Sequence, residues 1–316
     1  MQHVIIGNGP AGVIAADTIR QADPAASITL LGDEPGAPYG RMAIPYFLEG
    51  KIDEAGTHLR RDPTHFDQQR IELKGARVTA IDTDISQLTL DDGDSLGFDH
   101  LLIATGSRPN RPPIPGIDDP RVQTCWTLAD ARAIAERASK GAEVVLLGAG
   151  FIGCIVLEAL ASRGVKLTVV EMAERMVARM LDPNAGGMLQ AWCEKHGVNV
   201  RTNTAVTGIE SGADALGVSL DDGSVLPAQL LILAAGVRPN IDFLDGSGIE
   251  IDQGILVDEF MHTGKPGIYA AGDVAQGRDF STGNRMIHAI QPVAADPGRC
   301  AAMHMAIQTT PYPGGL

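Results

Sequence analysis

Cysteine is scarce in this chain, and the few that occur are too far apart for the usual roles of paired cysteines. The 316 residues include only four, Cys125, Cys154, Cys193 and Cys300, and no two of them lie within five residues of each other. This spacing provides neither a CxxC redox pair nor a zinc-binding cysteine pair. The eight histidines show no ligand spacing either. We therefore predict no redox-active disulfide and no metal site.

Positive charge and long apolar runs are also in short supply. Lys and Arg number 25 against 39 Asp and Glu, which gives a formal net charge of −14. An acidic surface repels phosphate backbones, so nucleic acid is excluded as a partner. No apolar run reaches the roughly eighteen residues that a membrane-spanning helix needs. Because Met1–His3 leads directly into the apolar run Val4–Ile6, we expect no cleavable leader and a cytoplasmic location.

What the chain does contain is a copy of itself. Val4–Ile6 leads into a glycine-rich turn, and Val144–Leu147 leads into a second turn of the same pattern. Asp91-Asp92-Gly93 recurs 130 positions later as Asp221-Asp222-Gly223, and Gly106–Pro109 recurs at the same offset as Gly236–Pro239. Two copies of one supersecondary plan explain this repetition better than chance does.

Each copy begins with the pattern of a βαβ unit. The predicted helices cover 11–22 and 151–163, and the strands that follow them cover 27–31 and 167–170. A strand, a helix and a second strand within about thirty residues require the two strands to pair in parallel. Further along, 78–81 with 87–90, and 205–209 with 218–220, predict antiparallel hairpins. Five prolines in the twelve residues from Pro109 to Pro120 mark a linker.

The two turns match the G-x-G-x-x-G pattern of dinucleotide-binding proteins. The pattern alone is a weak signal, but here each copy follows a buried strand and opens a helix. The first glycine permits the turn, the second lets the backbone approach a pyrophosphate, and the third lets the helix pack on the strand. The N-terminus of the helix then presents free N–H groups to the phosphates. The residues concerned are Gly7, Gly9, Pro10, Ala11 and Gly12, and in the second copy Gly148, Gly150, Phe151, Ile152 and Gly153.

Acidic residues follow the second strand of each copy. Glu171 comes eighteen residues after Gly153, where a carboxylate accepts both ribose hydroxyls of an adenosine and repels a 2′-phosphate. This favours NAD(H) over NADP(H), although Arg175 nearby would soften the preference. In the first copy, Asp33 and Glu34 offer a carboxylate one or two positions further past the end of the strand than Glu171 does in the second copy. The alternative interpretation of any one of these acidic residues is that it lies in solvent at the end of a strand and binds no ligand.

Two dinucleotide sites in one chain imply two dinucleotides. Electron transfer between the two dinucleotides makes chemical sense only if their redox rings differ, because hydride then passes from one ring to the other. We therefore expect a tightly held FAD in one copy and an exchangeable nicotinamide in the other.

These motifs together resemble the FAD- and NAD(P)-dependent pyridine nucleotide oxidoreductases. The chain is most similar to the branch with ferredoxin and rubredoxin reductases, the flavin domain of nitrite reductase and apoptosis-inducing factor, over residues 1 to about 305. The first turn matches the FAD pyrophosphate turn. Gly267–Asp273 matches the second flavin motif, whose aspartate holds the ribitol and pyrophosphate; the alternative for Asp273 is a helix cap. Two segments, Ala104-Thr105-Gly106 and Ala234-Ala235-Gly236, match the family's turns at which the chain passes between domains.

The resemblance implies an α/β fold with two Rossmann-like domains, the NAD domain inserted into the FAD domain. The FAD domain would comprise 1–112 and 241–316, and the NAD(P) domain 113–240. Arg41 resembles a family arginine near the flavin phosphates, with a surface arginine as the alternative. Val78 occupies the position where family members bind adenine through main-chain atoms. Residues 288–294 resemble the helix start beneath the flavin pyrimidine, and by analogy N–H groups near Pro292 and Val293 would stabilise the reduced flavin.

The chain departs from the family pattern in three respects. The segment after Arg41 contains no cysteine, which excludes a dithiol or cysteine-sulfenate centre beside the flavin. The lysine and glutamate that several relatives pair near Tyr46 and Ile155 are both absent, and losing both together is coherent because a lone buried charge is costly. Only 43 residues follow Asp273, so we expect the C-terminal interface domain of this branch to be missing. Three alternatives would account for this: the chain is a fragment, a separate subunit supplies that surface, or the protein is a natural two-domain form.

The resemblance implies an NADH:acceptor oxidoreductase that passes electrons from FAD to a carrier such as ferredoxin or rubredoxin, or to a nitrite-reductase-type partner. Proximity of the stacked rings supplies the catalysis, so no catalytic acid, base or nucleophile is assigned. Two alternatives stay open: an NADH oxidase that reduces oxygen or a small electrophile, and a non-catalytic FAD-binding sensor or subunit. A redox protein or partner subunit is the expected partner, and a homo- or hetero-oligomer is compatible with the sequence.

Overall fold

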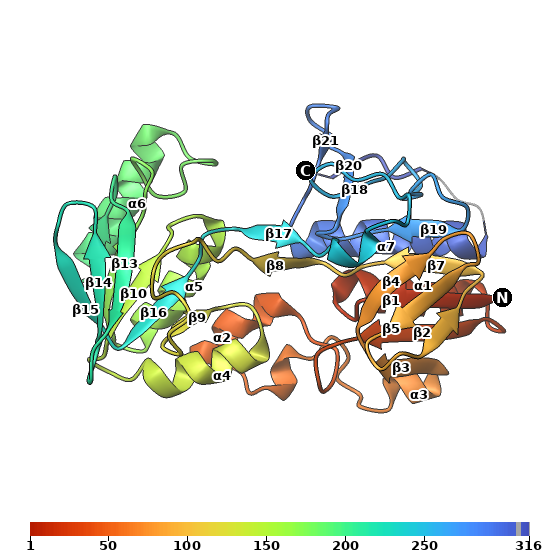
Figure 1. Cartoon of the computed structure of the whole chain (residues 1–316), viewed down its shortest axis with the longest axis horizontal. Helices are drawn as coiled ribbons and strands as arrows, with labels where there is room; N and C mark the ends of the chain where they lie inside the picture. The colour runs from red at the N-terminus through yellow and green to blue at the C-terminus, as the bar shows by residue number, and fades with distance from the viewer. Residues whose placement is uncertain (308–310, 316) are drawn as a thin grey trace. The chain divides into compact units, whose positions relative to one another are not determined.

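The computed structural model describes residues 1–307 and 311–315, and these form two compact units. Unit 1 contains Met1–Gly40, His58–Arg108 and the described residues from Pro239 onward, whereas unit 2 contains Arg41–Thr57 and Pro109–Arg238. Within these residues no helix is long and apolar enough to cross a membrane. Each unit is a mixed α/β body with its own sheet (Figure 1).

The sheets of the two units have the same plan. Unit 1 has five parallel strands in the order β19-β7-β1-β2-β3, and unit 2 has five parallel strands in the order β9-β16-β10-β11-β12. In each unit a glycine turn follows the central strand, β1 or β10. The duplication and the Rossmann-like fold expected from the sequence are confirmed. The strands are β1 (Gln2–Ile6), β2 (Ser27–Gly32), β3 (Ile71–Gly75), β7 (His100–Ile103) and β19 (Ile268–Ala270), and β9 (Val122–Thr124), β10 (Glu143–Leu147), β11 (Lys166–Val170), β12 (Asn199–Arg201) and β16 (Leu230–Leu233).

Two helices of unit 1 pack closely against each other because a small residue lies at their contact. In unit 1, α1 (Pro10–Ala22) lies against α7 (Gln291–Ala306). A Cβ on Gly298 of α7 would lie 2.5 Å from the carbonyl oxygen of Ala11, so only glycine permits this approach. Unit 2 contains α2 (Ile44–Leu48), α4 (Leu128–Arg137), α5 (Phe151–Ser162) and α6 (Pro183–Lys195).

A three-stranded antiparallel sheet repeats in both units. The predicted hairpins form as β4 with β5 and as β13 with β14, and a third strand that was not predicted joins each pair. The strands are β4 (Val78–Asp82), β5 (Gln87–Leu90) and β6 (Ser95–Gly97), and β13 (Val206–Ser211), β14 (Leu216–Leu220) and β15 (Val225–Ala228).

Short elements complete the chain. The strands β8 (Ser107–Pro109) and β17 (Val237–Pro239) form a two-stranded sheet. The remaining elements are α3 (His65–Gln68), β18 (Ile255–Leu256), β20 (Ala275–Arg278) and β21 (Arg285–Met286), with the 3-10 helices η1 (Arg41–Ala43), η2 (Ala55–Thr57) and η3 (Asp242–Leu244).

The proline-rich segment after Pro109 is a packed part of unit 2 and not a free connection. It contains neither helix nor strand from residue 110 to 121. However, Ile114 and Ile117 join the apolar core of unit 2, and the N–H of Ile209 donates to the carbonyl of Pro115 at 2.9 Å. Proline suits such a segment because it lowers the conformational entropy that the unfolded chain would gain.

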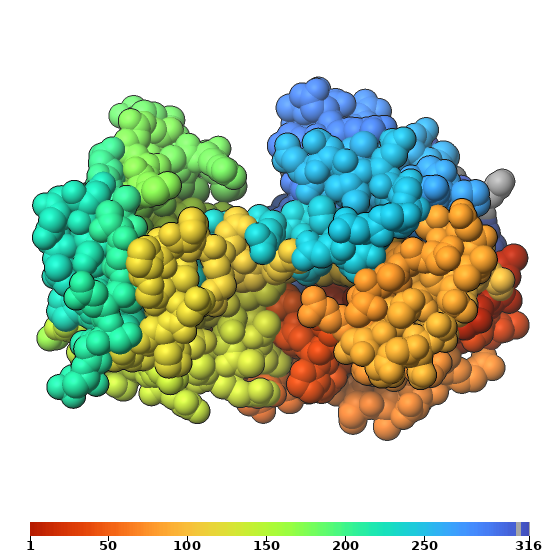
Figure 2. Space-filling view, in the orientation of Figure 1, coloured from red at the N-terminus to blue at the C-terminus, as the bar shows by residue number. Residues whose placement is uncertain are grey.

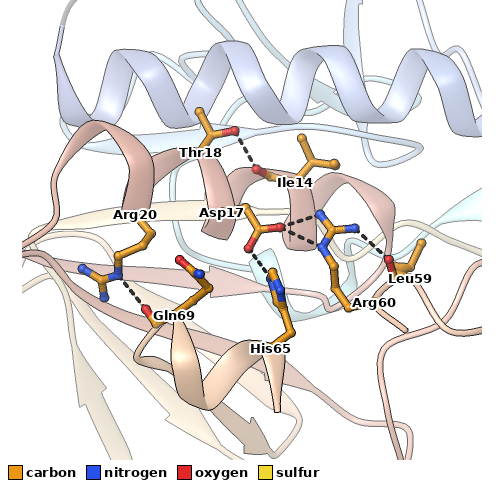
Figure 3. Close-up of polar contacts among 8 residues, drawn as sticks. All are labelled: Ile14, Asp17, Thr18, Arg20, Leu59, Arg60, His65 and Gln69. Atoms are coloured by element: carbon orange, nitrogen blue, oxygen red, sulfur yellow. Dashed lines mark hydrogen bonds and ion pairs between the residues drawn. The ribbon is translucent and has the colours of Figure 1, made fainter. Parts of the chain in front are cut away.

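Buried and half-buried charges anchor the segment that follows Thr57 to helix α1 (Figure 3). The Asp17 carboxylate accepts hydrogen bonds from the guanidinium of Arg60 at 2.5 and 2.9 Å, and from Nε2 of His65 at 2.8 Å. Arg20 is buried, and its Nε donates to the carbonyl of Gln69 at 2.7 Å. Charge-assisted bonds of this kind are stronger than neutral ones, so α1 fixes the position of this segment and of α3.

One arginine helps to hold the segment Arg41–Thr57 in unit 2. Arg163, at the C-terminal end of α5, donates to the carbonyls of Leu48 at 2.7 Å, Ala135 at 2.6 Å and Ala138 at 2.9 Å. These carbonyls lie at the ends of α2 and α4, where backbone acceptors are left without intrahelical partners and positive charge is favourable. Arg163 therefore joins three helix ends at one point.

Unit 1 also buries a histidine without hydrogen bonds. The His3 side chain is fully buried in β1, and its ring centroid lies 5.2 Å from that of His100 on β7. Neither ring nitrogen of His3 has a partner among the described residues. Burial, and to a lesser extent the neighbouring His100, lowers the pKa of His3 to about 4. The imidazole is therefore neutral in the folded protein throughout the physiological range.

We expect this histidine to make the protein sensitive to mild acid. Above the ordinary pKa of 6.5, His3 is neutral in both states and contributes no pH dependence. Between that value and about 4, only the unfolded chain binds the proton, so the free energy of unfolding falls as the pH falls, by up to about 3 kcal/mol in all. Urea unfolding of His3→Leu at pH 7.5 and pH 5 should show a smaller loss than in the parent protein. The exposed His196→Leu serves as control, and an equal loss in all three proteins would contradict the assignment.

Candidate dinucleotide-binding sites

The first glycine turn has the geometry that a dinucleotide pyrophosphate requires. Gly7 has φ +108°, and a Cβ there would lie 2.1 Å from the carbonyl oxygen of Ala104. A Cβ on Gly12 would lie 1.9 Å from the carbonyl oxygen of Gly7, so the third glycine lets α1 pack on the turn. A Cβ on Gly9, in contrast, would meet no atom within 4 Å. Two glycines thus serve the fold, whereas the middle one borders open space.

The second turn repeats this geometry. Gly148 has φ +103°, and a Cβ there would lie 2.5 Å from the carbonyl oxygen of Ala234. A Cβ on Gly153 would lie 2.2 Å from the carbonyl oxygen of Gly148, and one on Gly150 would meet no atom within 4 Å. In both units the first and third glycines of the turn are in close contact with the backbone, and the second borders open space.

Both turns present helix N-termini without side-chain caps. Gly9 and Gly150 are the N-cap residues of α1 and α5, no side chain accepts from their first N–H groups, and neither first turn contains an acidic residue. The helices are 13 and 12 residues long, so each directs a macrodipole at its turn. Each turn therefore has free N–H groups and, beside its middle glycine, open space, and both features suit the binding of a diphosphate.

Glu171 lies beside the second turn and is held firmly there. Its Oε2 accepts from the N–H of Ala149 at 2.6 Å, and its Oε1 accepts from the N–H of Ala173 at 2.8 Å. Arg175 does not offset this negative charge toward a ligand, because its guanidinium donates to the carbonyls of Leu181 and Ala178 and pairs with Glu174. The arrangement favours a ribose with free hydroxyls.

The corresponding position of the first copy lacks a carboxylate. The N–H of Gly7 donates to the carbonyl of Leu31, as that of Gly148 donates to Val170, so Gly32 corresponds to Glu171. A Cβ on Gly32 would lie 2.2 Å from Nδ2 of Asn8, whose side chain fills this space. Of the two predicted acids, Asp33 is exposed, and Glu34 is half-buried and accepts from the hydroxyl of Tyr39 at 2.5 Å.

The turns after β7 and β16 are held by two asparagines that sequence reasoning missed. Asn240 donates through Nδ2 to the carbonyl of Thr105 at 2.9 Å, and its own N–H donates to Gly106 at 3.0 Å. In unit 2, Asn110 bonds Ala235 and Gly236 in the same way, at 3.3 and 2.9 Å. The signal was available, since Arg-Pro-Asn at 108–110 recurs at 238–240.

The predicted residues of the second flavin motif lie near the start of α1. A Cβ on Gly272 would lie 3.3 Å from the Cβ of Ala11. Asp273 accepts from the hydroxyl of Ser107 at 2.7 Å and precedes strand β20, so it caps no helix. Pro292 and Val293 lie in the first turn of α7. Pro292 has no N–H, so only the N–H of Val293 would serve the predicted role.

Two predicted residues lie away from these strand ends. Arg41 belongs to unit 2, where its guanidinium lies 5.1 Å from the ring centroid of Trp126 and donates to the carbonyl of Trp126 at 2.7 Å. Val78 is buried at the start of β4 in unit 1. Apart from Pro292 and Val293 on α7, the remaining predicted residues of each unit directly follow its parallel strands or open the helix after the glycine turn, the usual position for ligands in such sheets.

All four cysteine thiols are free, and their surroundings keep them protonated. Burial raises the pKa of Cys125 to about 12 and that of Cys154 to about 11, and it also raises the pKa of Cys193 and Cys300. The thiolate is the reactive form of cysteine, so these groups are poor nucleophiles at neutral pH. Within residues 1–307 and 311–315, no three His, Cys, Asp or Glu side chains are placed to hold a metal ion.

Two parallel sheets, each with a glycine turn open to a diphosphate, define the class of dinucleotide-binding oxidoreductases. The chain belongs to the pyridine nucleotide-disulphide oxidoreductase family, whose model matches residues 1–307. Membership confirms the family expected from the sequence and implies bound FAD and NAD(H). The free, protonated thiols distinguish this chain from members that use a redox-active disulfide.

Named relatives match almost the whole chain. It is 35% identical over 306 residues to the NADH-dependent phenylglyoxylate dehydrogenase subunit epsilon of Aromatoleum evansii, covering 96% of this chain and 72% of that protein. It is 35% identical to rhodocoxin reductase of Rhodococcus erythropolis, covering 99% and 74%. Among solved structures, the ferredoxin reductase for the CYP199A2 system of Rhodopseudomonas palustris matches with a TM-score of 0.93 and 31% identity, over 99% of this chain and 78% of that one.

Proposed function

We infer that this chain is an FAD-dependent NADH reductase that passes electrons to a redox carrier protein in the cytoplasm. Unit 1 would hold FAD and unit 2 would hold NADH. The limits predicted from the sequence, 1–112 and 241–316 for the FAD domain and 113–240 for the NAD(P) domain, differ from these units at Arg41–Thr57 and by a few residues at each crossing. The observation that carries the proposal is the pair of glycine turns, in which Gly9 and Gly150 each border open space in an otherwise closely packed turn. Relatives named as rhodocoxin reductase and ferredoxin reductase support a protein carrier as acceptor.

The residues of unit 1 would bind FAD along the carboxyl ends of its strands. The N-terminus of α1 would receive the pyrophosphate, because its N–H groups are uncapped. Asp273, oriented by Ser107, would accept hydrogen bonds from hydroxyl groups of the ribitol region. Glu34, oriented by Tyr39, would do the same for the adenosine ribose. Each carboxylate is already held by a neighbouring hydroxyl, so little side-chain entropy is lost on binding.

The residues of unit 2 would bind NADH in the corresponding way. The N-terminus of α5 would receive the pyrophosphate, and Glu171 would accept from the adenosine ribose. A 2′-phosphate beside this carboxylate would meet like charge, and Arg175 is engaged elsewhere, so NADH is preferred over NADPH.

The chain supplies binding and orientation, and the cofactors supply the redox chemistry. Bound FAD would supply the capacity to take a hydride from NADH and to release electrons singly to a carrier. No described side chain is assigned as a catalytic acid, base or nucleophile. The raised pKa values of the four thiols argue against an oxidase that works through a cysteine thiolate.

Anaerobic stopped-flow reduction tests this function. NADH is expected to bleach the visible absorbance of the FAD-loaded protein within seconds, and an added carrier protein should then restore the colour faster than air does. If NADH leaves the flavin oxidised, the chain is a binding subunit and the proposal is wrong. If air restores the colour as fast as any carrier, the oxidase alternative is correct.

A further inference from the structure

The segment between β11 and α6 makes contacts with the second glycine turn that have no counterpart in the first copy. Residues 172–181 contain neither helix nor strand, and we call them the clamp. The N–H of Val177 donates to the carbonyl of Ala149 at 2.8 Å, while the N–H of Ala149 donates to Glu171 at 2.6 Å. Both polar groups of the residue between Gly148 and Gly150 are thus bound by the clamp or by Glu171 just before it.

The first copy serves as an internal comparison. Asn8 is the residue of the first turn that corresponds to Ala149, and no main-chain hydrogen bond joins it to the described residues 33–40 that follow β2. The two turns otherwise share their glycine contacts. The clamp is therefore a specific feature of the turn assigned to the exchangeable nucleotide, and not a requirement for forming such a turn.

Arg175 holds the clamp in its conformation from within. Its Nε donates to the carbonyl of Leu181 at 3.0 Å and its Nη2 to that of Ala178 at 3.2 Å. Met176 beside it is fully buried, and a Cβ on Gly186 of α6 would lie 2.9 Å from the Cδ of Arg175. The guanidinium bonds span the clamp and fix its fold against α6, although much of its surface lies in solvent (Figure 2).

Val177 occupies a strained conformation at the point of contact. Its φ of +50° is unusual for a β-branched residue, and such strain costs roughly 1–3 kcal/mol. Val177 also receives the N–H groups of Met180 and Leu181 on its carbonyl. The surrounding bonds therefore impose a conformation that the residue itself disfavours, and its N–H points at Ala149 as a result.

We propose that Arg175 and Val177 are positioning residues for NADH, acting through the clamp to fix the Ala149 peptide and the Glu171 carboxylate. Neither needs to touch the nucleotide. With both groups of Ala149 bonded, the turn is held ready for the pyrophosphate, and Glu171 is aimed before the ribose arrives. Preorganisation of this kind raises affinity by reducing the ordering cost of binding. This inference rests on the proposed NADH site.

The test compares two arginines of the clamp in the FAD-loaded protein. Calorimetric titration with NAD⁺, which cannot reduce the flavin, gives the Kd, and steady-state assays give KM and kcat for NADH. Arg175→Met is expected to raise the Kd and the KM about tenfold with kcat unchanged. Arg179→Met removes the same charge from an exposed position without described partners and should stay within about twofold of the parent. Arg175→Lys should fall between them, since one ammonium reaches one carbonyl.

A second variant keeps the proposal testable if Arg175→Met does not fold. Val177→Gly retains the N–H and accepts the positive φ, so it should raise the melting temperature. It should also raise the NAD⁺ Kd severalfold, because glycine loosens the clamp. A merely structural role would raise the melting temperature and leave the Kd unchanged, and that result would overturn the proposal, as would equal Kd values for Arg175→Met and Arg179→Met.

Glu171→Ala separates failure of this inference from failure of the site itself. If Glu171→Ala weakens NAD⁺ while Arg175→Met and Val177→Gly do not, the NADH site stands and the clamp has no positioning role. If Glu171→Ala also leaves the Kd unchanged, the proposed NADH site is wrong, and the positioning role fails with it.

Discussion

Gly9→Ala is expected to give a folded protein that purifies without FAD. The backbone at Gly9 has φ −74° and ψ −174°, which alanine adopts without strain, and its Cβ would meet no protein atom within 4 Å. The methyl group would instead fill the space that the FAD pyrophosphate needs beside the N-terminus of α1. We expect FAD affinity to fall at least about a hundredfold, which corresponds to ~2.7 kcal/mol. Flavin absorbance per protein after purification, together with circular dichroism, measures both parts of the prediction.

Two further glycine substitutions make this result interpretable. Gly12→Ala places a Cβ 1.9 Å from the carbonyl oxygen of Gly7, so it should destabilise unit 1 as well as abolish FAD binding. Gly187→Ala, in helix α6 with open space around it, should leave both folding and flavin content unchanged. A yellow Gly9→Ala protein with normal FAD content would show that the pyrophosphate does not lie against this glycine.

Short-range rules account for the parts of the fold that the sequence predicted well. The helix that begins at Pro10 and the one that begins at Phe151 follow directly from a buried strand, a glycine turn and an apolar stretch, all local in sequence. The hairpin strands at 87–90 and 78–82 follow from alternation around a turn. The repeat at an offset of 130 then doubled the evidence, because each motif could be checked against its copy.

Contacts between distant residues account for what the sequence did not predict. Arg163 donates to the carbonyl of Leu48, 115 positions away, and this bond is one of those that join Arg41–Thr57 to unit 2. Nothing in the local pattern of Arg163 distinguishes it from a solvated helix end. The third strand of each antiparallel sheet was missed for a related reason, since 95–97 and 225–228 contain Gly97 and Pro227 and pair only because a neighbouring strand offers free groups.

The residues of the candidate sites also differ in whether local sequence or distant contacts determine their roles. Glu171 was predicted from its spacing to the glycines, which is fixed by the geometry of the βαβ unit. Asn110 and Asn240 were not, because their role depends on turns 125 to 135 positions away in sequence. The clamp could not be predicted either, since the positive φ of Val177 is held by hydrogen bonds with Ala149, Met180 and Leu181 that no local propensity reveals.

Gly150→Ala is expected to separate the two half-reactions of the enzyme. Gly150 has φ −74° and ψ −170° and open space around it, so the fold should tolerate the methyl group as Gly9→Ala does. FAD content should be normal, because the change lies in unit 2, whereas the KM for NADH should rise about a hundredfold. Dithionite, which needs no nucleotide site, should reduce the flavin of the variant as fast as that of the parent.

The comparison of reductants makes this outcome decisive. A variant that loses NADH reduction but keeps dithionite reduction and carrier reoxidation has lost only nucleotide binding, and this would assign the second turn to NADH. Loss of FAD from Gly150→Ala with NADH binding intact would reverse the assignment of the two units. Since the two turns are nearly identical in glycine geometry, their different ligands must be distinguished by what surrounds them: a carboxylate fixed by Ala149 in unit 2, and an asparagine that fills the same space in unit 1.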